Sequence, residues 1–183
     1  MSSVRVVLGH GASGSAASMS SFVEGLEERG IGAQAVDLPR RKAEDVVARW
    51  LELAPPGPAI VAGGHSFGGR VASLAAAIGA GEAGLQHTYR GLVCFSYPLH
   101  RPGSAEFGPR IAHWPSIACP VLLLSGESDP FARVDLLRTA VGSFPHGELV
   151  TYPKLGHTLR PVLDDVLDRV AAFIRALPEP RLQ

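Results

Sequence analysis

The sequence contains little cysteine and little lysine. Cys94 and Cys119 are the only cysteines among 183 residues, too few for a disulfide-stapled secreted domain or for a cysteine zinc site. Lys42 and Lys154 are the only lysines, and the other basic side chains are arginines. We attribute this preference for arginine to genome composition and not to chemistry.

The sequence also lacks an excess of charge of either sign. Lys and Arg number 17, as do Asp and Glu, so the formal net charge is zero at pH 7. Proteins that bind nucleic acid or anionic membranes usually carry a basic excess. The balance therefore argues against both kinds of partner.

Long apolar runs are absent as well. No uninterrupted run approaches the roughly 18 apolar residues of a transmembrane helix. The first apolar run ends at His10 and is too short for the core of a signal peptide. We therefore expect a soluble, cytoplasmic protein.

The composition that remains is that of a folded chain. Apolar residues make up 46% and charged residues 19%, which excludes an intrinsically disordered protein. At roughly 150 residues per domain, a chain of this length corresponds to about one domain with one sizeable core. We expect a single domain over residues 1–183.

Short apolar runs alternate with segments of helical spacing. The runs predict six strands, at residues 4–8, 34–38, 59–62, 92–95, 121–124 and 149–152. The spacing of apolar residues between them predicts helices at residues 22–29, 43–53, 70–78, 130–141 and 162–174. Strands that are apolar almost throughout and separated by helices indicate a mostly parallel sheet covered on both faces. The predicted fold class is α/β.

A nucleophile pattern follows the third predicted strand. Residues 64–68 read Gly-His-Ser-Phe-Gly and match Gly-x-Ser-x-Gly. In this pattern the serine occupies a strained turn from strand to helix, and small flanking residues avoid clashes there. The strand before Ser66 and the alanine-rich helix after it supply that context. The alternative is that Ser66 is an ordinary N-cap of the helix.

Two further residues follow predicted strands and suit an activated serine, which needs a base and an acid that orients the base. Asp129 follows the fifth strand and His157 follows the sixth. Ligands of an open parallel sheet bind beyond the carboxyl ends of its strands, so these residues and Ser66 should meet at one edge. The alternatives are that Asp129 caps a helix beginning at Pro130 and that His157 is an ordinary loop histidine.

The loop after the first strand is rich in glycine. Residues 10–14 read His-Gly-Ala-Ser-Gly. Acyl transfer needs backbone N–H donors aimed at the developing oxyanion, and we expect the amides of Ala12 and Phe67 to provide them. The alternative is a loop that cradles phosphate, but neither Gly-x-Gly-x-x-Gly nor a Walker pattern is present.

With these motifs the chain resembles the α/β-hydrolase-fold superfamily along essentially its whole length, in a minimal form without the first two strands and without a cap domain. Within it, the chain resembles the small group that includes the testis-expressed protein thirty and the NSL chromatin-complex subunit three. Segments 63–73, 97–103 and 126–131 carry this closer resemblance. The resemblance implies that the first and third strands are neighbours, and its triad positions match Ser66, Asp129 and His157.

We therefore expect a serine hydrolase that acts on small acyl substrates without a metal or another cofactor. Ser66 would attack, His157 would transfer the proton, and Asp129 would orient the imidazole. The competing hypothesis is an interaction protein that retains the fold without catalysis. We expect neither nucleic acid nor membrane as a partner, and a homodimer is left open.

The segment 97–118 is long for a connection in a compact domain, and such segments are usually functional. We expect it to line the substrate pocket, with Tyr97, His100 and Arg101 as substrate-binding residues; Leu99, Phe107, Arg110 and Trp114 are further candidates. The alternative is that its arginines are solvated and its aromatic residues seal the edge of the sheet.

Overall fold

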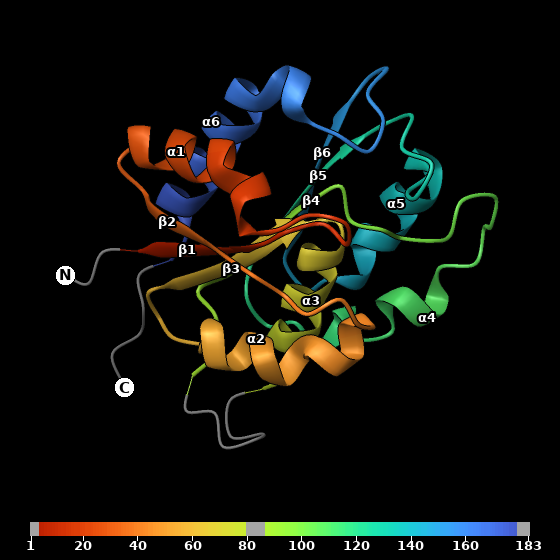
Figure 1. Cartoon of the computed structure of the whole chain (residues 1–183). Helices are drawn as coiled ribbons and strands as arrows, with labels where there is room; N and C mark the ends of the chain where they lie inside the picture. Colours follow the sequence, from red (N-terminus) through yellow and green to blue (C-terminus); the bar gives the residue numbers. More distant parts are fainter. Residues whose placement is uncertain (1–3, 80–86, 179–183) are drawn as a thin grey trace.

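Six strands form one sheet in the computed structural model of the chain, which describes residues 4–79 and 87–178 (Figure 1). The strands are β1 (Arg5–Gly9), β2 (Gly32–Val36), β3 (Ile60–His65), β4 (Gly91–Phe95), β5 (Val121–Gly126) and β6 (Gly147–Tyr152). Their order is β2-β1-β3-β4-β5-β6, and every neighbouring pair is parallel. The predicted α/β class is confirmed, and the sheet is parallel throughout.

The predicted strands lie close to the observed ones, with one exception. The strand predicted at residues 34–38 lies two residues later in the chain than β2. β2 pairs with β1 from Gly32 to Val36 and ends there. The reason is a side chain: the Leu38 N–H donates to His10 Nε2 at 3.0 Å, so this amide is not available to continue the ladder. Leu38 is buried nonetheless, and this apolar residue extended the predicted strand beyond Val36.

Helices cover both faces of the sheet. Figure 1 shows α1 (Ser20–Glu28) and α6 (Leu163–Ala176) on one face, and α2 (Val47–Leu53) and α3 (Phe67–Ala76) on the other. Side chains of α5 (Val134–Ala140) join the same core as those of α2 and α3. Two apolar cores result, one on each side of the sheet. No helix of the described residues is long and apolar enough to cross a membrane.

One predicted helix begins later than expected, and one segment expected to be irregular contains a short helix. The helix expected at 130–141 begins at Val134, because residues 130–133 form a turn in which the Phe131 N–H donates to Asp129 Oδ1 at 2.8 Å. The segment 97–118, expected to be irregular, contains the short helix α4 (Gly108–Ile111).

The parallel topology positions the site. Because all six strands run in one direction, the loops after β1, β3, β4, β5 and β6 leave the sheet at the same edge. β1 and β3 are hydrogen-bonded neighbours, as the strand order of the superfamily implied. The loop that contains Ala12 therefore lies against the turn that contains Ser66.

Candidate active site

Ser66 occupies a strained turn between β3 and α3. Its φ is +51° and its ψ is −112°, a combination that residues other than glycine rarely adopt and that only a well-determined surrounding structure maintains. The turn lies against the end of β1, where a Cβ atom added to Gly68 would lie 2.2 Å from backbone atoms of Gly9. A Cβ atom on Gly64 would lie 2.4 Å from the Gly9 carbonyl oxygen. Glycine is therefore required on both sides of the serine.

The Ser66 hydroxyl does not cap α3. Ser66 stands at the N-cap position, but its side chain makes no capping hydrogen bond. The hydroxyl lies 2.8 Å from Nε2 of His157 instead. Ser66 thus occupies the N-cap position, as the alternative expected, but its hydroxyl does not form the capping hydrogen bond.

A continuous chain of hydrogen bonds joins Ser66, His157 and Asp129. His157 Nδ1 lies 2.8 Å from Asp129 Oδ2, and the Asp129 side chain is fully buried whereas that of His157 is 25% exposed. An ionised carboxylate can only accept, so Nδ1 carries the proton and Nε2 is free to accept the proton of the Ser66 hydroxyl. The other oxygen of Asp129 accepts the Phe131 N–H. Asp129 thus bonds a local backbone amide and also holds the imidazole.

Two further rings, those of Phe131 and His65, lie close to the His157 ring. The centroid of the Phe131 ring is 4.6 Å from that of His157, and the centroid of the His65 ring is 5.1 Å away. His65 Nε2 lies 3.0 Å from the His157 carbonyl oxygen and donates to it, because a carbonyl only accepts. Burial lowers the pKa of His65, which favours its neutral ring. Both residues adjoin predicted site residues, but spacing does not show which way a neighbouring side chain points.

The two residues whose amides we expect to bind an oxyanion lie in the loop after β1 and at the start of α3. Ala12 and Phe67 both line the cavity at Ser66. Within the described part of the chain, neither amide N–H donates to a protein acceptor. The loop is fixed from both sides, since the Gly68 N–H donates to the His10 carbonyl and the His10 ring accepts the Leu38 N–H. The two amides are therefore available to a ligand at fixed positions.

The cavity at Ser66 has a volume of about 470 Å³. Its walls come from the loop after β1, the turn at Ser66, the loop before His157 and the segment 97–118. From the last segment the cavity takes Pro98, Arg101, Pro102 and Arg110. The prediction for Arg101 therefore agrees with the structure in its position.

Tyr97 and His100 lie elsewhere, which corrects their prediction as substrate-binding residues. Each is 1% exposed, and neither is among the residues that line the cavity. The Tyr97 hydroxyl donates to the Arg110 carbonyl at 2.8 Å, and His100 Nε2 accepts the Arg133 N–H at 2.9 Å. These two side chains hold the segment in place from inside the core. Three further candidates, Leu99, Phe107 and Trp114, also pack in or against that core.

Three arginines give the cavity a basic wall. Arg70 from α3 lines it together with Arg101 and Arg110. Burial, and then the charge of Arg70, lower the pKa of Arg110. Within the described residues no group of three or more His, Cys, Asp or Glu side chains is arranged to hold a metal ion.

The site can support acyl transfer chemistry. Its hydroxyl lies next to a nitrogen that can accept its proton, that nitrogen belongs to a ring oriented by a buried carboxylate, and two free amides lie nearby. A nucleophile, a base, an orienting acid and oxyanion donors are the parts that such reactions need.

Known structures share this architecture. The monoacylglycerol lipase of Paleococcus ferrophilus aligns with a TM-score of 0.72 at 14% identity, over 92% of this chain and 94% of that one. Est1E of Butyrivibrio proteoclasticus aligns with a TM-score of 0.74 at 17% identity, over 94% and 87% of the two chains. The esterase Pf2001 of Pyrococcus furiosus aligns with a TM-score of 0.71 at 17% identity, over 96% and 84%. At these identities the likeness shows the fold.

Sequence comparison supplies the family. No curated protein matches the chain, and the closer resemblance to the testis-expressed protein thirty group stays a prediction. The family model described as an alpha/beta hydrolase domain matches residues 34–175, which is well over half of the chain. The matched region includes Ser66, Asp129 and His157. The chain therefore belongs to the α/β-hydrolase domain family.

Proposed function

We propose that the protein is a serine hydrolase that cleaves ester or thioester bonds of small acyl compounds. The observation that carries the proposal is the hydrogen-bond chain from Ser66 through His157 to Asp129, which begins at a strained strand-to-helix turn. Strained backbone persists where the surrounding structure enforces it, and such positions cluster at active sites. The esterases and the lipase of the same fold are consistent with this substrate class.

Each group has one task in the proposed reaction. The Ser66 oxygen attacks the acyl carbon while neutral His157 takes the hydroxyl proton at Nε2. Asp129 stabilises the imidazolium that forms. The amides of Ala12 and Phe67 donate to the oxyanion of the tetrahedral intermediate. His157 then returns the proton to the leaving alcohol or thiol, and water releases the acyl group from Ser66 by the same steps.

His65 has a positioning task in this proposal. Its hydrogen bond to the His157 carbonyl joins the loop after β6 to the residue that precedes Ser66. The nucleophile and the base come from different loops, and a small displacement between them would weaken catalysis strongly. A neutral His65 adds no positive charge beside the imidazolium.

The competing function is that of an interaction protein that retains the fold. A binding surface alone requires neither the strain at Ser66 nor the burial of Asp129 behind His157. We favour the enzyme because the strained backbone of Ser66 and the buried carboxylate of Asp129 are joined through His157 at the Ser66 hydroxyl.

A panel of 4-nitrophenyl esters of increasing acyl length tests the proposal. The wild-type protein should hydrolyse at least one ester above background, and the Ser66→Ala variant should not. Activity should persist in EDTA, since no step requires a metal. Equal hydrolysis by the wild type and the Ser66→Ala variant would refute the assignment of the nucleophile, and loss of activity on chelation with recovery in zinc would refute the metal-free mechanism.

A further inference from the structure

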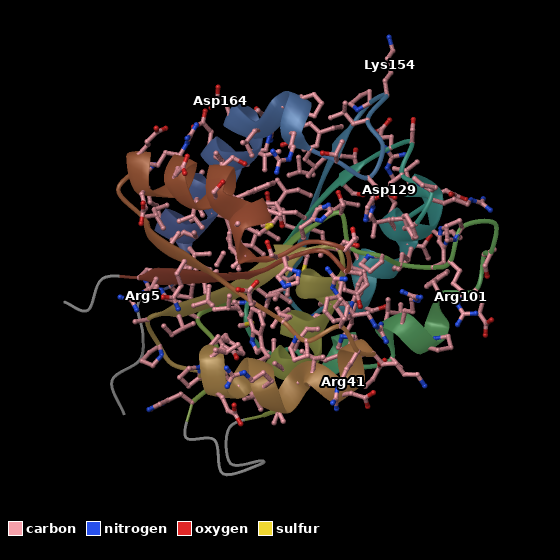
Figure 2. The ribbon with its side chains drawn as sticks, in the orientation of Figure 1. Arg5, Arg41, Arg101, Asp129, Lys154 and Asp164 are labelled. Atoms are coloured by element: carbon pink, nitrogen blue, oxygen red, sulfur yellow. The ribbon has the colours of Figure 1, made fainter. Side chains whose placement is uncertain are left out.

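Basic side chains are concentrated in the cavity at Ser66 and in the hollow beside it. Arg70, Arg101 and Arg110 line both spaces. Arg41 and Lys42 also line the adjoining hollow. Arg41 and Arg101, which both line this hollow, are labelled in Figure 2. Together the two spaces form a continuous surface of five cationic side chains that begins at the nucleophile.

Few carboxylates offset this charge. Among the residues that the structure describes, no Asp or Glu lines the cavity at Ser66, and only Glu44 and Glu106 line the adjoining hollow. Glu44 pairs with Arg70. Within residues 4–79 and 87–178, neither Arg101 nor Arg110 forms an ion pair. The protein as a whole is electrically neutral, so the excess is a property of this site.

The segment that carries two of these arginines is held in place through its backbone. The Arg110 carbonyl accepts hydrogen bonds from Arg70 Nη1 at 2.9 Å and from the Tyr97 hydroxyl at 2.8 Å. Arg110 Nη1 donates to the Pro98 carbonyl at 3.1 Å, which leaves its remaining N–H groups without a protein acceptor in the described chain. The Arg70 side chain is only 12% exposed. Arg70 and Arg110 are thus ordered before any ligand binds, which reduces the entropy cost of binding at this part of the site.

The arginines also repel one another. Besides burial, the neighbouring charges of Arg70 and Arg101 lower the pKa of Arg110. The Arg101 guanidinium donates to no protein acceptor in the described part of the chain. An anion between Arg101 and Arg110 would remove this repulsion, and guanidinium groups bind carboxylates and phosphates in paired hydrogen bonds.

We propose that Arg101 and Arg110 bind an anionic group of the substrate, a carboxylate or a phosphate, while Ser66 attacks its ester or thioester bond. The substrate class is therefore an ester or thioester that carries a carboxylate or a phosphate. This inference rests on the proposed hydrolase function of Ser66. The nonpolar surface of Phe67, Pro98 and Pro102 in the same cavity would contact the part of the substrate between the anion and the reacting bond.

Kinetics with three matched esters test the inference. The esters are 4-nitrophenyl butyrate, which is neutral, 4-nitrophenyl hemiglutarate, which has the anion on the acyl side, and 3-carboxy-4-nitrophenyl butyrate, which has it on the leaving group. The wild type should prefer one anionic ester. Arg101→Gln should raise the KM for that ester roughly tenfold, about 1.4 kcal/mol. The kcat/KM for the neutral ester should fall less than about twofold.

A matched variant controls for net charge. Arg5 is exposed at the start of β1, at the amino end of the strand, and Figure 2 shows it on the opposite side of the molecule from Arg101. Arg5→Gln removes the same charge and should leave the preference for the anionic ester unchanged. Equal effects of Arg101→Gln on neutral and anionic esters, or none on either, would overturn the inference.

A binding experiment separates this inference from the proposed function. Titration calorimetry of the Ser66→Ala variant with glutarate and with inorganic phosphate needs no catalysis. At least one of the two anions should bind, the tighter one identifies the preferred anion, and Arg101→Gln should weaken it about tenfold. Absence of binding by both anions would overturn the inference even if esters are hydrolysed. Anion binding without any hydrolysis would retain the anion site and remove the hydrolase function.

Discussion

The two ends of the cavity satisfy their polar groups in different ways. At the serine end, Ser66, His157 and Asp129 bond to one another and to the backbone. At the arginine end, Arg70 and Tyr97 donate to the Arg110 carbonyl and Arg110 donates to Pro98. Other N–H groups of Arg101 and Arg110 have no protein acceptor among the described residues.

In the proposed hydrolase, this difference would separate the reaction from the choice of substrate. The serine end is complete without a ligand, as a preorganised reaction centre should be. The arginine end has positive charge that no carboxylate of the described residues neutralises at Arg101 and Arg110, which would favour the binding of an anionic group. The first end depends on strand termini and the second on a segment packed against α3, so the two should fail separately.

The largest effect should follow from breaking the serine end. We expect Ser66→Ala and His157→Ala to reduce kcat by at least about 10⁴-fold, and Asp129→Asn to reduce it roughly tenfold less, because nucleophile and base remain. Stability should change little in Ser66→Ala, since a hydroxyl at a turn is not part of the core. Steady-state kinetics on the best ester and urea unfolding provide both measurements. A Ser66→Ala protein with full activity would contradict the assignment.

A second change tests the backbone of the same end. Gly68→Ala places a Cβ atom where the Gly9 backbone already lies, so we expect the free energy of unfolding to fall by about 3 kcal/mol. Gly142 is the control, because a Cβ atom there meets nothing within 4 Å, and Gly142→Ala should change stability by less than about 0.5 kcal/mol. Equal unfolding midpoints in urea for the two variants would show that the turn tolerates a shift.

The arginine end should be sensitive to acid through His113. Its ring bonds Ser73 of α3 at 2.8 Å, and burial followed by the charge of Arg70 lowers the pKa of His113 to about 4. Above the ordinary histidine pKa of 6.5, His113 is neutral in both the folded and the unfolded state, so its protonation does not reduce the free energy of unfolding. Between 6.5 and about 4 only the unfolded state binds the proton, so stability falls as the pH falls.

Urea unfolding at several pH values measures this loss. We expect about 2 kcal/mol between pH 6.5 and 4, less than the full linkage value because the ring is partly exposed. His113→Asn should remove that part of the pH dependence, and His146→Asn, at an exposed position, should retain it. An unchanged pH dependence in His113→Asn would contradict the role given to its burial.

The smallest expected effect concerns the support of the arginine end. Tyr97→Phe keeps the ring in the core but removes one of two donors to the Arg110 carbonyl, so it should cost about 1 kcal/mol of stability. The KM for the anionic ester should rise two- to threefold, roughly, because Arg110 gains freedom. Tyr152→Phe removes a hydroxyl bonded to Asp165 of α6 and should leave that KM unchanged. Equal changes in KM for both variants would show that Tyr97 acts only on stability.

The sequence predicted that Ser66, Asp129 and His157 would lie together, and the reason is physical. Ser66, Asp129 and His157 each follow a strand of a parallel sheet, so the topology alone brings them to one edge. The amides of Ala12 and Phe67 belong to the backbone, and their position follows from the pairing of β1 with β3. The topology thus brings these residues to one edge of the sheet, and the hydrogen bonds of the Asp129 and His157 side chains are then formed in the loops.

The arginine end was predicted only in part. Tyr97, His100 and Arg101 follow β4 closely, yet the first two point into the core and the third lines the cavity. Ser96 has a φ of +51°, so the chain changes direction directly after the strand. Beyond that point tertiary contacts, and not a periodic pattern, decide which side chains face the cavity. Arg70 was missed as a lining residue because it belongs to a helix whose pattern indicated only burial.

The central claim is that Ser66 is an activated nucleophile, and covalent labelling tests it most directly. The protein is incubated with a fluorophosphonate probe, and the modified peptide is identified by mass spectrometry, with Ser66→Ala and His157→Ala as controls. We predict stoichiometric modification of Ser66 in the wild type, none in Ser66→Ala, and strongly slowed labelling in His157→Ala. A folded wild-type protein that stays unlabelled, or that is labelled equally fast without His157, would contradict the claim and favour a non-catalytic interaction protein.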